Sequence, residues 1–124
     1  MTSTKKMLDG FGVEFFAGIA VKNYKISLDW YERLFGCPPS FFPNDKEAVW
    51  QLTEHQWIYI VVQPKQAGGS VHTILGDNLD KLITQISKRG IEFSKEEIPA
   101  ENVRKVMYYD PDGNEIGFGS VASK

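Results

Sequence analysis

The chain repeats one order of secondary structure: a strand, a helix and three further strands are expected twice between residues 10 and 121. Alternating apolar runs indicate the strands, and apolar side chains three and four residues apart indicate the helices. The segment 64–69 (PKQAGG), the only linker-like composition in the chain, separates the two halves. The halves share this pattern more than they share residues, which is typical of an old internal duplication.

The two halves have matching lists of expected elements. In the first half we expect strands at 10–21, 40–42, 47–52 and 57–63, and a helix at 26–35. In the second half we expect strands at 71–75, 91–96, 103–109 and 115–121. The second helix carries Leu79, Leu82, Ile83 and Ile86 at helical spacing. Each helix is expected to end at a glycine, Gly36 or Gly90.

A βαβββ unit predicts the fold, because its helix covers one face of its sheet and leaves the other face bare. Such a unit needs a second one to bury the rest. We therefore predict one α+β domain over residues 10–121, made of modules 10–63 and 70–121 that form a curved mixed sheet with a central cleft. Residues 1–9 are expected to be an N-terminal arm.

The segment 110–118 (DPDGNEIGF) predicts a tight turn between two strands. Pro111 fixes φ at the second position of such a turn, and Gly113 supplies the positive φ that closes it. In the strand that follows, Gly117 and Gly119 share a face with Glu115. Two glycines on one face leave room beside the backbone for a ligand or another chain. A turn with no further role is the alternative interpretation.

Composition narrows the classes of partner. The net charge of −2 argues against a nucleic acid or an anionic membrane as the partner, and no apolar run is long enough to span a bilayer. Cys37 is the only cysteine, so an internal disulfide and a cysteine zinc site are excluded. A reducing, cytoplasmic location is the default expectation. The 13% aromatic content suits a cavity as well as a core.

Two motifs carry a resemblance to a known family. The helix end at 28–36 (LDWYERLFG) and the DPDGN-x-I turn, set in the repeated βαβββ order, resemble the vicinal oxygen chelate superfamily. That superfamily includes glyoxalase I, bleomycin-resistance proteins, fosfomycin-resistance transferases and extradiol dioxygenases. The resemblance implies the fold more strongly than the reaction, because this scaffold hosts many chemistries.

The resemblance also implies a divalent metal in the cleft, held by His or Glu side chains that act on substrate oxygens. The family's ligand positions fall here on Phe16, on Tyr59 or Ile60, on Val71 with His72 beside it, and on Gly117. Most of these side chains are not metal ligands. We therefore expect no metal and no cofactor.

An apolar cleft with a few polar groups favours binding of a small amphipathic or aromatic molecule. The residues expected to bind it are Glu14, Phe16, Trp50, Tyr59, His72, Tyr108 and Glu115. The leading hypothesis is a metal-free binding protein similar to the bleomycin-resistance branch, whose resemblance also implies a homodimer.

Two enzyme hypotheses stay open beside it. One is a divalent-metal lyase, isomerase or thiol transferase of the glyoxalase type that uses His72, Glu14 and Glu115. The other is a metal-free isomerase in which Glu14 or Glu115 is a general base, its pKa raised by aromatic surroundings.

Overall fold

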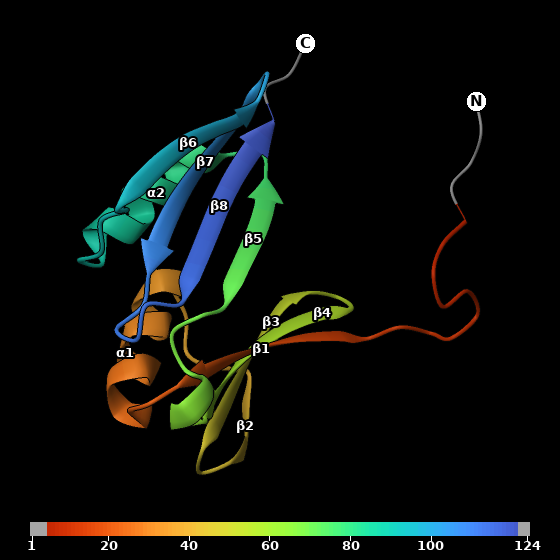
Figure 1. The fold of residues 1–124 in the computed structure, drawn as a ribbon, viewed down its shortest axis with the longest axis vertical. Helices are drawn as coiled ribbons and strands as arrows, with labels where there is room; N and C mark the ends of the chain where they lie inside the picture. The colour runs from red at the N-terminus through yellow and green to blue at the C-terminus, as the bar shows by residue number, and fades with distance from the viewer. Residues whose placement is uncertain (1–4, 122–124) are drawn as a thin grey trace.

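A computed structural model describes residues 5–121 and has two consecutive modules of the same order (Figure 1). The first module consists of β1 (Phe15–Val21), α1 (Tyr24–Phe35), β2 (Phe41–Asn44), β3 (Glu47–Thr53) and β4 (Gln56–Val62). The second consists of β5 (Val71–Gly76), α2 (Leu79–Lys88), β6 (Lys95–Ala100), β7 (Val103–Tyr109) and β8 (Glu115–Val121). A short 3₁₀ turn at Pro64–Gln66 lies in the predicted linker. The predicted α+β class and the paired βαβββ units are confirmed.

The strands form two four-stranded mixed sheets with equivalent topology. Sheet 1 has the order β1-β4-β3-β2, and sheet 2 has the order β5-β8-β7-β6. In each sheet the first strand of the module pairs in parallel with the last, and the other pairs are antiparallel. The helix of a module is the crossover that brings its first strand beside its last.

Two predicted strands have different bounds in the structure. β1 begins at Phe15 rather than at residue 10, because its partner β4 begins at Gln56 and residues 10–14 have no strand to pair with. The predicted strand 91–96 is displaced to Lys95–Ala100. Ile91 is buried and donates its N–H to the carbonyl of Ile86, so it packs against the end of α2 instead of joining the sheet.

The two helices begin and end close to the predicted residues. Asn23 caps α1 by accepting a hydrogen bond from Ile26 N at 3.1 Å, so the helix starts two residues before the predicted Ile26. Gly36 ends it in the left-handed conformation with φ +80°. α1 buries Tyr31 and Leu34, and α2 buries Leu79 and Ile86. Among residues 5–121, no helix has the length and apolar character needed to cross a membrane.

The two motifs that carry the family resemblance meet in the core. Tyr31 of α1 donates to Asp110 Oδ2 at 2.7 Å, and both groups are buried. Asn114 is fully buried; its amide donates to Asp110 and to the carbonyl of Ala20, and its oxygen accepts from Ser70. The predicted turn therefore joins the modules, because its side chains bond to α1, to β1 and to the linker.

The hydrophobic core is shared by both modules. Its buried side chains come from α1, α2 and one face of each sheet, including Ile19, Tyr31, Trp50, Ile86 and Phe118. Residues 5–14 extend away from this core, as the red segment in Figure 1 shows. Residues 1–4 of the predicted N-terminal arm lie outside the described residues.

Candidate functional site

Each sheet has a helix side, which contributes to the core, and an open face turned away from it. In β1 the side chains of Ile19 and Val21 are buried on the helix side, while Phe16 and Gly18 lie on the open face. In β8 the buried side chains are Ile116 and Phe118, and Glu115, Gly117 and Gly119 share the open face.

Four aromatic side chains lie together on the open face of sheet 1; we call them the aromatic row (Phe16, Phe41, Trp57 and Tyr59). The rings of Phe16 and Trp57 are stacked, with centroids 5.5 Å apart and planes inclined by 6°. Phe41 meets Trp57 edge to face at 6.0 Å. The Tyr59 ring lies over Gly18, where an added Cβ would be 2.6 Å from it. Glycine at position 18 thus makes room for the fourth ring.

Glu14 is the acidic group at one end of the aromatic row. Its carboxylate accepts from Trp57 Nε1 at 3.1 Å and lies 2.5 Å from His55 Nδ1. The bond from Trp57, followed by the bond to His55, lowers the pKa of Glu14 below its ordinary value of 4.5. The hypothesis that aromatic surroundings raise the pKa of Glu14 for general-base chemistry is therefore wrong.

The open face of sheet 2 carries a polar group around Glu115. Tyr109 OH donates to one oxygen of Glu115 at 2.9 Å, and Lys105 Nζ lies 3.7 Å from the other. The bond to Glu115 raises the pKa of Tyr109. The Lys105 side chain also passes over Gly117, where an added Cβ would lie 2.5 Å from Lys105 Cε. The space that the sequence predicts beside Gly117 is thus filled by Lys105.

Three other predicted site residues lie on the helix side. Trp50 is only 3% exposed and donates its Nε1–H to the carbonyl of Cys37 at 3.0 Å. Tyr108 packs edge to face with Phe93 and Phe118, and burial raises its pKa. Burial lowers the pKa of His72, whose Nδ1 is buried without a hydrogen-bond partner within residues 5–121.

The seven predicted residues therefore lie in three places rather than in one cleft. Glu14, Phe16 and Tyr59 share the open face of sheet 1, and Glu115 lies on the open face of sheet 2. Trp50, His72 and Tyr108 are the helix-side residues. Sequence reasoning missed Phe41 and Trp57; both have the strand alternation that places them beside Phe16.

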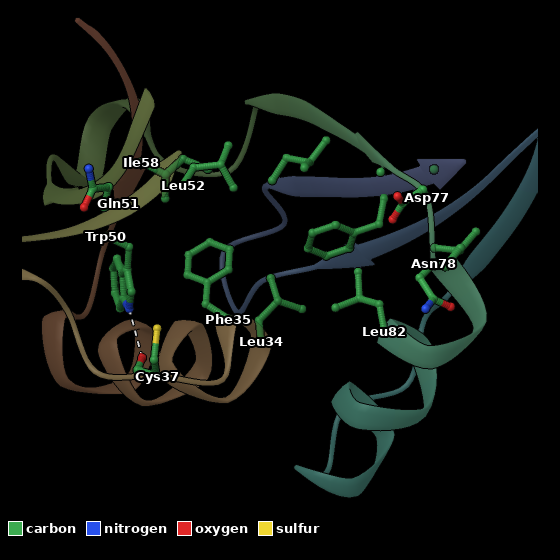
Figure 2. A pocket seen from close by; sticks show the side chains of 15 residues that line it. Leu34, Phe35, Cys37, Trp50, Gln51, Leu52, Ile58, Asp77, Asn78 and Leu82 are labelled. Carbon is green, nitrogen blue, oxygen red and sulfur yellow. Dashed lines mark hydrogen bonds between the residues drawn. The ribbon is translucent and has the colours of Figure 1, made fainter. Parts of the chain in front are cut away.

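A cavity of about 460 Å³ opens between the two modules on the helix side (Figure 2). Trp50 and Phe35 form its wall in the first module, and Leu82 and Phe118 form the facing wall in the second. Figure 2 shows Asp77 and Asn78 at the opposite end of the cavity from Trp50. Of the seven predicted residues, only Trp50 lines it. The contribution of α2 depends on how the modules pack, which no local sequence signal reports.

Comparison with known proteins gives a family for this fold. Residues 13–118 match the family described as the Glyoxalase/Bleomycin resistance protein/Dioxygenase superfamily. The chain belongs to this superfamily. A glyoxalase/bleomycin resistance protein from Catenulispora acidiphila DSM 44928 has a similar crystal structure, with 45% identity and a TM-score of 0.85. That match covers 89% of this chain and 99% of the other.

More distant superfamily structures share the fold. A bleomycin-binding protein complexed with bleomycin has 16% identity and a TM-score of 0.69, covering 86% of this chain and 97% of that one. A lactoylglutathione lyase from Agrobacterium tumefaciens has 14% identity and a TM-score of 0.69, covering 86% and 91%. A search of functionally curated proteins gave no match.

The superfamily implies a divalent metal, and the side chains of this chain do not fit one. His72 lies on the helix side of sheet 2, while Glu14 and Glu115 lie on the open faces of different sheets. Within residues 5–121, no three His, Cys, Asp or Glu side chains are grouped as a metal site requires. Phe16 and Gly117 occupy positions where the superfamily has ligands.

Proposed function

We propose that this superfamily member binds a flat, amphipathic small molecule on the aromatic row, without a metal. The observation that carries this proposal is the stack of Phe16 on Trp57 with Phe41 at its edge, on a face where Phe16 and Phe41 are 46% and 43% exposed. Exposed rings arranged in a row are costly in water unless they serve recognition. They offer a flat apolar surface on which a planar ligand stacks.

Glu14 gives this surface a polar end. Because its pKa is lowered, the carboxylate is ionised at neutral pH and accepts hydrogen bonds beside the ring of Trp57. A ligand with an aromatic body and a donor group, neutral or cationic, matches a row of rings that ends in a carboxylate. The bleomycin-binding structure shows that this fold binds an organic molecule in one relative, which supports this class of ligand here.

We further propose that the protein is a cytoplasmic homodimer in which the open face of sheet 2 from one copy covers the aromatic row of the other. The open face of sheet 2 carries Val71, Leu75 and Val121, which are 65%, 60% and 58% exposed. Apolar side chains gathered on one bare sheet face favour burial against another chain.

The test is a binding measurement by isothermal titration calorimetry with metal-free bleomycin and a panel of planar aromatic amines, on protein treated with a chelator. We expect Phe41→Ala to weaken the best binder about tenfold, because it removes one ring of the platform. Phe42→Ala is the matched control, since Phe42 is the next residue of β2 and points to the other face of the strand.

Two outcomes would contradict the proposal. One is that Phe41→Ala and Phe42→Ala have equal effects. The other is that binding appears only after nickel, zinc or manganese is restored and disappears in His72→Ala, which would favour the metal-dependent lyase or isomerase.

A further inference from the structure

We infer that the cavity between the modules is a second binding site, for an elongated, uncharged and mainly apolar molecule with one hydrogen-bond donor. This site is separate from the aromatic row. Ile58, which lines the cavity, and Trp57, which belongs to the row, are neighbours on β4 and point to opposite sides of sheet 1.

The walls of the cavity are preformed by side chains that the core holds in place. Leu34, Trp50 and Phe118 are 1%, 3% and 7% exposed, and they come from both modules. Trp50 packs edge to face on Phe35 at 5.3 Å. Its single N–H is already bonded to the carbonyl of Cys37, so the ring offers the cavity only apolar surface. A ligand would therefore be bound there without ordering new structure.

The volume and lining of the cavity determine the class of ligand. About 460 Å³ is within the range of small-molecule sites, which are mostly apolar with a few placed polar groups. Water gains little in such a space, because it needs two to four polar partners and the walls beside Phe35, Leu82 and Phe118 supply none.

The polar end, at Asp77 and Asn78, selects the functional group. Asn78 precedes α2 without using its side chain as a cap, so its amide oxygen is available to a ligand donor. The carboxylate of Asp77 repels an anion and accepts a hydrogen bond. Figure 2 shows both residues at the end away from Trp50, which places the donor at one tip of the ligand and its ring system near the tryptophan.

The test uses N-phenyl-1-naphthylamine, an uncharged probe with one N–H whose fluorescence rises in apolar sites. We expect saturable binding to the full chain that falls at least tenfold in Leu82→Trp, because the larger ring fills the cavity. Lys81→Trp is the matched control, since it adds the same ring one residue away on the exposed side of α2.

A second pair of measurements examines the polar end and the location of the probe. Asn78→Leu should weaken N-phenyl-1-naphthylamine about threefold or more, and should not weaken 1-benzylnaphthalene, in which CH₂ replaces the N–H. Bound probe should also slow alkylation of Cys37, which is exposed and lines the cavity.

The results separate this inference from the proposed function. Loss of probe binding in Leu82→Trp, with retention in Phe41→Ala and in Lys81→Trp, supports the cavity site. Loss in Phe41→Ala with retention in Leu82→Trp places the probe on the aromatic row and overturns the inference. Absence of saturable binding by the unchanged chain, or alkylation of Cys37 at an unchanged rate, also overturns it.

Discussion

Single residues in this chain have roles that follow from which side of a sheet they occupy. His72 and Glu115 are close in the predicted site, yet β5 and β8 place His72 on the helix side and Glu115 on the open face. His72 therefore acts through burial. Its Nδ1 has no hydrogen-bond partner within residues 5–121, and the surrounding apolar groups disfavour its charged form.

We predict that His72 makes the protein less stable as the pH falls below 6.5. The pKa of His72 is lowered from its ordinary value of 6.5, so the unfolded chain takes up the proton at a pH where the folded chain does not. The free energy of unfolding should therefore be complete above pH 6.5 and decline as the pH falls toward the folded-state pKa. Urea denaturation at pH 7.5 and at pH 5.0 measures this difference.

The control for this prediction is His72→Gln, which keeps a polar side chain but does not titrate in this range. Its loss of stability between the two pH values should be smaller than that of the unchanged chain. An equal loss in both proteins would assign the pH dependence to other groups.

Among the elements, the turn between β7 and β8 is the connection that holds the two modules together. Asp110 accepts from the backbone N–H groups of Asp112 and Asn114 and from Tyr31 OH, and Gly113 has φ +94°. Asn114 then links the turn to β1 and to the linker. The sequence interpretation of this segment as a hairpin turn is confirmed, and the structure adds its role between modules.

We predict that Asn114→Ala lowers the free energy of unfolding by about 3 kcal/mol, because it leaves several buried donors and acceptors without partners. Those groups include Asp110 Oδ2, the carbonyl of Ala20 and the N–H groups of Gly68 and Ser70. Asn44→Ala is the matched control, since Asn44 is exposed and bonds only to its own turn. Chemical denaturation monitored by circular dichroism gives both values; similar losses would contradict the prediction.

At the scale of the whole molecule, the modules bury their helix sides together and leave the open faces bare. The core is continuous across both modules, whereas Phe16 and Phe41 on sheet 1 and Val71 and Leu75 on sheet 2 are exposed. The proposed homodimer covers these faces and would place the polar group around Glu115 near the aromatic row of a second copy.

We predict that Leu75→Asp converts the dimer to a monomer, because a carboxylate buried in an apolar contact without a partner costs several kcal/mol. Sedimentation velocity at micromolar concentration measures the mass of the unchanged chain and of the variant. Ile98→Asp is the control: Ile98 is 74% exposed on β6, and its replacement should leave the dimer intact. A monomeric unchanged chain would contradict the proposal directly.

The sequence by itself determined the repeated order, the glycine-ended helices, the turn at 110–114 and the superfamily. These features depend on local rules: the alternation of a strand, the spacing of a helix and the φ that a glycine permits. β7 and β8 have the predicted bounds because each is a clear apolar run next to a strong turn signal.

Only the tertiary structure decided which face of each sheet the helix covers. Both faces of β1, β3 and β4 carry large apolar side chains, as in Phe15 and Phe16 or Trp57 and Ile58, so alternation separates the faces without naming the buried one. Trp50 and Tyr59 therefore appear equivalent in sequence and lie on opposite sides of sheet 1. The packing of α1 and α2 between the modules makes that choice, and it also creates the cavity that Trp50 lines.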